Sequence, residues 1–276
     1  MQTRHPEPCA VRGLTEDLLA SRSDDNKRLH CSRYAPFPVA EFACYPAAVL
    51  AALLAALLLL TQPSPQVDVA LDPGHSRADI GSSGNGLREY QLTLDLAQRV
   101  RLRLQAAQLS VRLTREDDVP LTVYTNPLAT EQIQAEQAAR IVAAGASRVY
   151  VSLHFNGGPT NLRGTETYFN PDRAADTISS DYALATALQR HVVAALADEV
   201  GYASVDRGVK SDLAAGKPYG HFFSLRGPVP SALVENLFLS NATEAALLRD
   251  DATLDALADG CAQGVLEYLA AAAAAD

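Results

Sequence analysis

The run Val149-Tyr-Val-Ser-Leu-His154-Phe-Asn156 is rich in β-branched and aromatic residues and is followed at once by Gly157-Gly158. Such a run predicts a buried β-strand over Arg148–Leu153, with His154 just past its end at the start of a loop. A second run, Val67–Asp72, has the same character and leads through a proline and a glycine to His75. Each strand is therefore expected to end in a histidine at the start of a loop.

Strand-like runs alternate with helix-like runs along the rest of the chain. Further strands are expected over Ser110–Thr114, Gly164–Phe169 and Ala232–Asn236, and helices over Tyr90–Gln108, Glu131–Ala144, Asp181–Val200 and Thr243–Ala270, the last with a break near Asp250-Asp251. This alternation predicts a single α/β domain with a central mixed, mostly parallel sheet flanked by helices. Ligands of such sheets bind beyond the carboxyl ends of the strands, where both histidines are expected.

Two glutamates are expected at the same edge of the sheet. Glu89 follows a glycine-rich loop and opens a helix, whose N-terminus lies at that edge if the crossover is right-handed. Glu235 lies late in its strand among apolar residues, where a carboxylate needs a compensating cation or a raised pKa. In a purely structural interpretation, Arg226 is the compensating charge.

The four residues His75, Glu89, His154 and Glu235 suit the chemistry of a metal-dependent hydrolase. Two imidazoles and one carboxylate can hold a zinc ion and leave one position open for water, and a further carboxylate can act as the base on that water. Each residue also has an ordinary alternative. His75 could be a loop histidine, His154 a buried hydrogen-bonded one, and Glu89 a partner of the helix dipole.

Composition narrows the functional classes for this chain of 276 residues. Its net charge of −9 provides no basic surplus for phosphate groups, so we expect no nucleic-acid partner. Three of the four cysteines precede residue 45, which leaves Cys261 without a disulfide partner in the later domain. Cys261 falls in a helical pattern and is expected to be a buried thiol.

The N-terminal part has a different character. Residues 1–41 are mixed in charge and lack periodicity, which predicts disorder, whereas residues 42–60 contain no charge and fit either a transmembrane anchor or a signal-peptide core. A linker over 61–66 and a globular domain over 67–276 follow. Basic residues precede the apolar segment, so the domain is expected outside the cytoplasm, in the cell envelope, as a secreted or membrane-anchored protein.

Seven motifs occur in a fixed order along the domain. They are Asp72-Pro-Gly-His75, Gly86-Leu-Arg-Glu89, Leu113-Thr-Arg115, Ser152-Leu-His154-Phe-Asn156, Arg163-Gly-Thr-Glu-Thr-Tyr168, Arg207-Gly-Val-Lys210 and Leu233-Val-Glu235-Asn-Leu-Phe-Leu-Ser-Asn241. Any one motif alone is weak evidence for a protein family, but the ordered set is specific for one. From about residue 67 to residue 268 the chain resembles the zinc-dependent N-acetylmuramoyl-L-alanine amidases of the type 3 cell-wall family.

The resemblance implies a reaction and a set of roles. The family hydrolyses the amide between N-acetylmuramic acid and the L-alanine of peptidoglycan stem peptides, with a metal-bound water as nucleophile. Carried over to this chain, one zinc ion is held by His75, Glu89 and His154, and Glu235 is the general base. Candidate contacts to the substrate or to the oxyanion are Asn156, Gly157 and Arg226. Peptidoglycan is the implied partner, and no activator protein is indicated.

The chain departs from the family pattern at two places, and two alternative functions stay open. Ser76-Arg77 stands where the family commonly has two glycines, and Phe155 stands where a small residue is common. Both could reshape the cleft without touching the ligands. The alternatives are a zinc peptidase or deacylase on the same fold, and a wall-binding module that has lost catalysis, although the presence of all four site residues counts against the second.

Overall fold

The computed structural model describes residues 66–126 and 128–275. The segments predicted at 1–41 and 42–60, and most of the linker at 61–66, lie outside the described residues. Within the described ranges, no helix is both long enough and apolar enough to cross a membrane.

The described chain alternates strands and helices as expected. The strands are β1 (Val67–Pro73), β2 (Ser83–Gly84), β3 (Leu87–Arg88), β4 (Val111–Leu113), β5 (Ser147–Asn156), β6 (Thr165–Phe169), β7 (Asp206–Ser211) and β8 (Ser231–Phe238). The α-helices are α2 (Glu89–Ala106), α3 (Thr130–Ala144), α4 (Ala175–Val200), α5 (Ala242–Leu247) and α6 (Asp251–Ala275), and two short 3₁₀ turns are η1 (Asp212–Ala215) and η2 (Phe223–Arg226).

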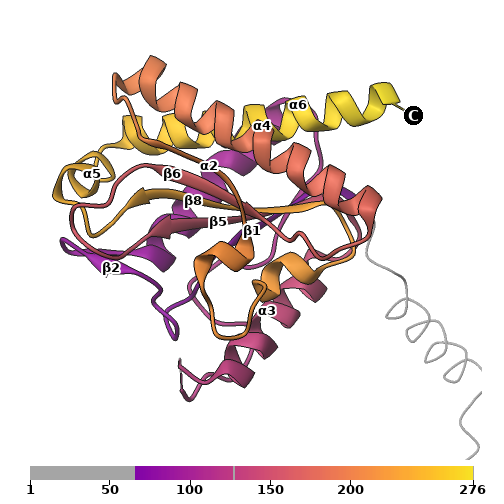
Figure 1. Ribbon diagram of the computed structural model, residues 1–276, viewed down its shortest axis with the longest axis horizontal. Helices are drawn as coiled ribbons and strands as arrows, with labels where there is room; N and C mark the ends of the chain where they lie inside the picture. Colours follow the sequence, from indigo (N-terminus) through magenta and orange to yellow (C-terminus); the bar gives the residue numbers. More distant parts are fainter. Residues whose placement is uncertain (1–65, 127, 276) are drawn as a thin grey trace, which may run out of the picture. The chain divides into compact units, whose positions relative to one another are not determined.

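Six strands form the central sheet in the order β4-β1-β5-β8-β6-β7. All neighbouring pairs are parallel except β6 and β8, which run antiparallel. The predicted α/β domain with a mixed, mostly parallel sheet is therefore confirmed. Helices α2, α4 and α6 cover one face of the sheet, and α3 lies on the other (Figure 1).

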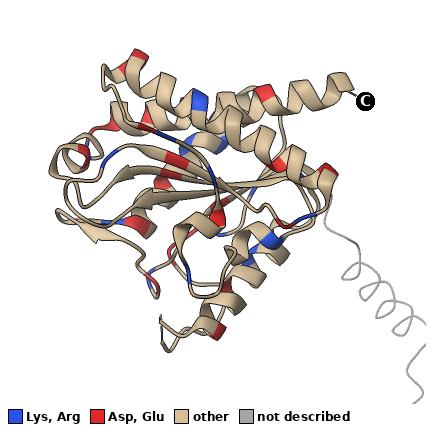
Figure 2. Ribbon diagram, in the orientation of Figure 1, with Lys and Arg blue, Asp and Glu red and all other residues tan. Residues whose placement is uncertain are grey.

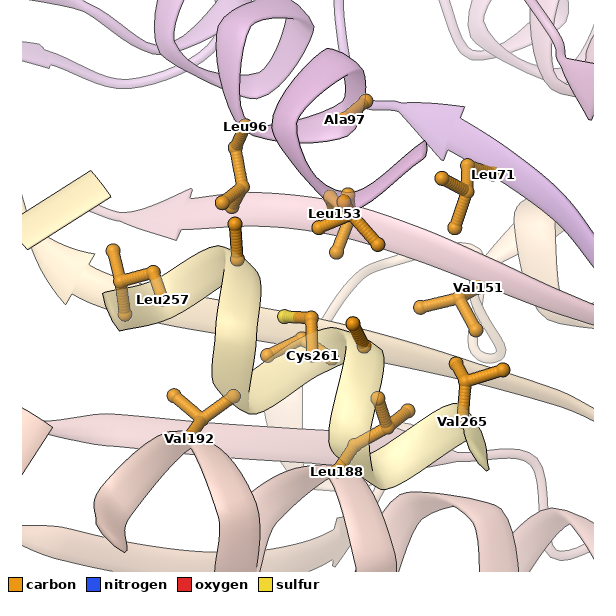
Figure 3. Close-up of a cluster of buried hydrophobic side chains, with 14 of the residues drawn as sticks. Leu71, Leu96, Ala97, Val151, Leu153, Leu188, Val192, Leu257, Cys261 and Val265 are labelled. Carbon is orange, nitrogen blue, oxygen red and sulfur yellow. The ribbon is translucent and has the colours of Figure 1, made fainter. Parts of the chain in front are cut away.

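The face beneath α2, α4 and α6 holds the main apolar core (Figure 3). Helices α4 and α6 approach closely, because a Cβ added at Gly264 would lie 2.7 Å from the Cα of Leu188 and one at Gly260 would lie 2.7 Å from the Cα of Val192. Cys261 lies between these two glycines as a free, buried thiol, which confirms its expected role as a small apolar residue. We call this side of the sheet the closed face.

The strands divide their side chains between the two faces with a period of two. On β5, Val149, Val151 and Leu153 belong to the main core of the closed face. The intervening residues Ser152 and His154 are polar, buried, and point to the side of α3. We call that side the open face, because α3 and the turn η2 cover it only in part.

Some elements differ from those predicted. The edge strand β7 was not predicted, because Asp206-Arg-Gly-Val-Lys-Ser211 lacks the apolar alternation of a strand with one buried face. Helix α4 begins at Ala175 rather than Asp181, because its first six residues are mostly polar, none of them is buried, and they show no apolar stripe. The break predicted near Asp250-Asp251 is confirmed by the boundary between α5 and α6.

Candidate metal centre

His75 lies just past the end of β1, in a loop whose backbone carbonyl oxygens accept hydrogen bonds from two arginines. The side chain of Arg140 is fully buried, and its guanidinium donates hydrogen bonds to the carbonyl oxygens of Pro73 and His75, each at 2.6 Å. Arg115 donates to the carbonyl oxygens of Pro73 at 2.9 Å and Gly74 at 3.0 Å. His75 itself adopts a left-handed backbone conformation with φ of 61°. The loop that presents the imidazole is therefore fixed by hydrogen bonds to its backbone.

Glu89 is the first residue of α2, and its carboxylate is buried with an exposed fraction of 2%. One carboxylate oxygen accepts a hydrogen bond from the backbone N–H of Phe155 at 3.0 Å. The other accepts one from the backbone N–H of Ser82 at 2.6 Å. These bonds tie the end of β5 and the glycine-rich loop to one side chain.

The structure brings His75, Glu89 and His154 together into one cluster. The His154 Nδ1 atom lies 2.9 Å from one Glu89 oxygen, and the His75 Nε2 atom lies 3.3 Å from the other. One ligand atom from each residue lies within 4.8 Å of the other two, so the three form a candidate metal site. The imidazole rings meet edge to face, with their centres 4.9 Å apart.

Two glycines make room for the cluster. A Cβ added at Gly74 would lie 2.3 Å from the His154 ring. One added at Gly81 would lie 2.5 Å from both the Glu89 carboxylate and the His75 ring. Neither position accepts a larger residue unless the ring or the carboxylate moves, so the backbone surrounds the cluster closely.

The imidazole of His75 is oriented by Asp79, whose Oδ2 atom lies 2.9 Å from His75 Nδ1. Asp72, which precedes this loop, does not make the contact. Asp72 is fully buried and instead accepts hydrogen bonds from Thr114, Ser152 and Arg140 at 2.6, 2.8 and 3.0 Å. Because the Asp72 carboxylate is engaged by these three partners, it is Asp79, on the outer loop, that contacts the Nδ1 atom of His75.

The two imidazoles have opposite pKa shifts. Burial disfavours protonated His75, but the charge of Glu89 and the hydrogen bonds to Asp79 and Glu89 outweigh it and raise the pKa of His75 to about 10. Burial lowers the pKa of His154, and its hydrogen bond to Glu89 offsets this only in part. The pKa of Glu89 is held well below the ordinary value despite its burial, chiefly by the charge of His75. The buried carboxylate thus requires a positive charge beside it.

Glu235 lies next to this cluster on the open face. In the strand register it pairs with His154 of β5 on one side and with Glu166 of β6 on the other. Residues paired in neighbouring strands project to the same face, so the three side chains form a row across the sheet. The Oε2 atom of Glu235 is buried and has no hydrogen-bond partner among the described residues.

The environment of Glu235 favours its neutral form. Burial raises the pKa of Glu235 well above the ordinary glutamate value, and the nearby charges of Glu89 and Glu166 add to the shift. The positive charges of His75 and Lys217 act in the opposite direction. A carboxylate with a raised proton affinity is suited to accept and return a proton near neutral pH.

Glu166, by contrast, is satisfied by a polar network. It accepts hydrogen bonds from Arg207 Nε at 2.8 Å, from Tyr168 Oη at 3.0 Å and from Asn156 Nδ2 at 3.3 Å. Lys210 forms an ion pair with the same carboxylate. Although burial opposes it, the hydrogen bonds and charges of Lys210 and Arg207 lower the pKa of Glu166. The two glutamates of the row therefore have opposite pKa shifts.

The remaining predicted contact residues lie in distinct places. Asn156 bonds to Glu166, and Gly157 packs so closely on Ser82 that a Cβ would lie 2.5 Å from its hydroxyl. Arg226 forms no ion pair with Glu235 in the described part of the chain, so the purely structural interpretation of that pair is wrong. The guanidinium of Arg226 lies over the Phe223 ring and bonds to backbone carbonyl oxygens.

Sequence reasoning missed Asp79, Arg140 and Glu166. Glu166 lies in the Arg163-Gly-Thr-Glu-Thr-Tyr168 motif, and its alternation with Tyr168 signals a shared face. Asp79 and Arg140 carry no such signal, because their partners come from distant segments.

Fold and site together define a class: an α/β protein with a His-Glu-His candidate metal centre at the carboxyl edge of its parallel strands. Comparison with known proteins is more specific. The Amidase_3 family model, described as N-acetylmuramoyl-L-alanine amidase, matches residues 69–267. The chain therefore belongs to this family.

Individual relatives agree with the family match. An endolysin of Bacillus phage SPP1 is 31% identical over 206 residues, which are 73% of this chain and 65% of the endolysin. The N-acetylmuramoyl-L-alanine amidase LytC of Bacillus subtilis (strain 168) is 28% identical over 211 residues, 76% of this chain and 37% of LytC. The chain therefore spans less than two thirds of the length of either relative.

Solved structures show the same fold. The catalytic domain of CwlV, an N-acetylmuramoyl-L-alanine amidase from Bacillus (Paenibacillus) polymyxa var. colistinus, matches with a TM-score of 0.57 and 29% identity, over 74% of this chain and 98% of that domain. An N-acetylmuramoyl-L-alanine amidase from Clostridium difficile 630 matches with a TM-score of 0.58 and 26% identity, over 75% of this chain and 98% of the other.

Proposed function

We propose that this protein hydrolyses the amide bond between N-acetylmuramic acid and the L-alanine of peptidoglycan stem peptides, with one zinc ion per chain. The observation that carries the proposal is the juxtaposition of the His75, Glu89 and His154 cluster with the unpartnered carboxylate of Glu235. Membership of the amidase family supplies the substrate class.

The residues of the cluster fit zinc. Two imidazole nitrogens and one carboxylate oxygen are ligands that catalytic zinc sites use, and they leave a coordination position open. The buried Glu89 carboxylate favours a cation at this place, and Asp79 fixes the orientation of His75 as an outer partner of a ligand does. A zinc ion held here would polarise the scissile carbonyl and lower the pKa of a water molecule.

Glu235 is proposed as the general base. Its free Oε2 atom can accept a proton from the attacking water, and its raised pKa allows it to hold that proton until the leaving amine of L-alanine takes it. Asn156, the backbone N–H groups at Gly157 and the guanidinium of Arg226 remain candidate contacts to the substrate or to the developing oxyanion.

The proposed substrate places the working domain outside the cytoplasm, in the cell envelope. A secreted or a membrane-anchored form, depending on the fate of residues 42–60, is the location that the sequence predicts. A reporter fused to the C-terminus of the full chain should be active only outside the cytoplasm. Recovery of the intact full-length protein from the soluble cytoplasm would contradict this placement.

The reaction is tested with purified peptidoglycan and the purified protein. We expect release of stem peptides with a new free N-terminal L-alanine, and of glycan strands with intact lactyl groups, both identified by mass spectrometry. Release of peptides cut within the stem would instead show a peptidase.

A further inference from the structure

A cleft of about 180 Å³ opens beside the candidate metal centre and has two chemically different walls. One wall carries the cluster histidines together with the acidic residues Asp79 and Glu235. The other is formed by the segment 217–224, with the aromatic residues Tyr219, Phe222 and Phe223 and the cation Lys217. Lys217 is the only Lys or Arg that lines the cleft within the described residues.

The wall that carries Lys217 is anchored at its base through His221. The His221 ring lies between two carboxylates, with Nδ1 at 2.8 Å from Asp212 and Nε2 at 2.9 Å from Asp172. Asp212 is fully buried and also accepts a hydrogen bond from the backbone N–H of Phe222 at 2.9 Å. These contacts fix the segment to the end of β6 and to η1.

The tip of the wall is a tight turn. The backbone N–H of Gly220 donates to the carbonyl oxygen of Lys217 at 3.0 Å, and Gly220 has a φ of 74° that favours glycine. Tyr219 stacks on Phe223 with ring centres 4.6 Å apart, and Arg226 donates to the carbonyl oxygen of Tyr219 at 3.1 Å. Lys217 therefore projects from a turn whose backbone is held in place.

Lys217 is available to a ligand. Its side chain is exposed, and no ion pair joins it to any other described residue. The other lysine of the described chain, Lys210, is engaged with Glu166. The ammonium of Lys217 lies 6.0 Å from the centre of the Phe222 ring, at the limit of a cation–π contact, so this ring does not sequester it.

We propose that Lys217 binds the carboxylate of the stem-peptide residue that follows L-alanine, and that it thereby selects stems in which this carboxyl group is free over stems in which it is amidated. This inference rests on the proposed function. In the stem, the carboxyl group of L-alanine is consumed in a peptide bond, so the nearest ionisable carboxyl belongs to the next residue. Two residues span at most about 7 Å, so this carboxyl group stays close to the scissile amide.

The ammonium of Lys217 would offset negative charge in and around the cleft. The chain carries a net charge of −9, and Figure 2 shows Asp and Glu on most elements of the domain. The cleft itself contains Asp79, whose carboxylate repels an anionic stem. An unpaired cation in the same cleft compensates this repulsion for one carboxylate, and an uncharged amide at the same position gains much less.

The test uses two soluble muropeptides that differ only at the second stem residue, which is D-glutamate in one and D-isoglutamine in the other. For the zinc-loaded wild-type full chain, we expect kcat/KM to favour the free carboxylate by about three- to tenfold, because the pair is partly exposed. Raising the salt concentration should reduce this ratio. Lys217→Gln should bring the ratio close to one, Lys217→Glu should invert it, and Lys217→Arg should retain it.

Arg190→Gln is the matched control, because it removes one positive charge from the exposed surface of α4 without touching the cleft. It should leave the ratio unchanged. A variant that is merely destabilised would lose activity on both muropeptides equally, and its ratio would stay as in the wild type. An unchanged ratio in a folded, active Lys217→Gln protein would overturn the inference while leaving the proposed amidase function intact. Absence of cleavage of both muropeptides and of intact wall by the wild type would instead refute the proposed function.

Discussion

The two faces of the central sheet are built from the same strands and have opposite chemistry. On the closed face, β1, β5 and β8 contribute Leu71, Leu153 and Val234 to an apolar core under three helices. On the open face the same strands contribute Asp72, His154 and Glu235, all polar and at least partly buried. One face therefore supplies the apolar burial that stabilises the fold, and the other holds charges whose burial has to be compensated by specific partners.

The two faces allow the activity of such a domain to be separated from its stability. Alternation with a period of two means that adjacent residues of one strand serve different purposes. His154 lies between Leu153 and Phe155, both of which are buried apolar residues. Substitution of Glu235, the open-face carboxylate with an unpartnered oxygen, is expected to change chemistry with little loss of folding, and substitutions on the closed face should do the reverse.

The largest effect is expected for Glu235→Gln on the open face. The amide keeps the shape of the side chain but cannot accept the proton, so turnover should fall by about 10²- to 10⁴-fold. The melting temperature should stay close to that of the wild type, because Glu235 Oε2 makes no hydrogen bond that would be lost. Zinc content, melting temperature and muropeptide cleavage are measured on one sample. A folded, zinc-loaded variant with near-normal turnover would show that another group is the base.

A smaller effect is expected for Asp79→Asn, which keeps the shape but weakens the contact that orients His75. Loss of such an outer partner costs about 10- to 100-fold in metal affinity. Competition for zinc with a chelator of known affinity measures the change. Asp117→Asn, on an exposed neighbouring loop, is the control and should bind zinc like the wild type. Equal zinc affinity in the two variants would rule out the proposed role of Asp79.

On the closed face, Gly264→Ala tests the contact between α4 and α6. The added methyl group would overlap the backbone of Leu188, so the free energy of unfolding should fall by about 1–3 kcal/mol. Gln263→Ala, an exposed change in the same helix, should be nearly neutral. Denaturant unfolding gives both values, and zinc affinity should be unchanged in each variant. A Gly264→Ala protein as stable as the wild type would show that the helices are not in the close contact described.

The smallest effect concerns the anchor of the cleft wall. Hydrogen bonds to Asp212 and Asp172 raise the pKa of His221, so the folded protein holds this proton more tightly than the unfolded chain does. The resulting stability is fully present below the unfolded pKa of about 6.5 and is lost as the pH rises through the folded pKa. His221→Gln should therefore lower the melting temperature at pH 5.5 more than at pH 9, by an amount worth about 1 kcal/mol or less. An equal loss at both pH values would show that the anchor is not ionic.

Much of this comparison could be predicted from the sequence. The strand-like character of Arg148–Leu153 and the position of His154 just past its end indicated both the sheet and the edge that carries the site. The positions of His75 and Glu235 followed from strand ends, and the position of Glu89 followed from a helix start. Their roles followed from the resemblance to the amidase family. These signals are local in the chain, which is why a single sequence displays them.

Other features depend on contacts between distant segments and left no local signal. The pairing of Glu166 with Glu235 requires β6 to lie antiparallel beside β8, which no pattern in Gly164–Phe169 reveals. The arginine at position 140 looks like an ordinary helical residue, yet its guanidinium is fully buried against the loop of His75. The transmembrane anchor or signal-peptide core predicted over residues 42–60 remains a prediction.

The most direct test of the account measures zinc content and muropeptide cleavage on the same sample of the full chain, before chelation, after it, and after zinc is returned. We predict about one zinc per chain at the outset, as the three-ligand site requires. Cleavage of the amide to L-alanine should be lost with the metal and recovered with it, and His154→Ala should neither hold zinc nor cleave. Full cleavage by the metal-free protein would contradict the claim that the open face is a zinc hydrolase site.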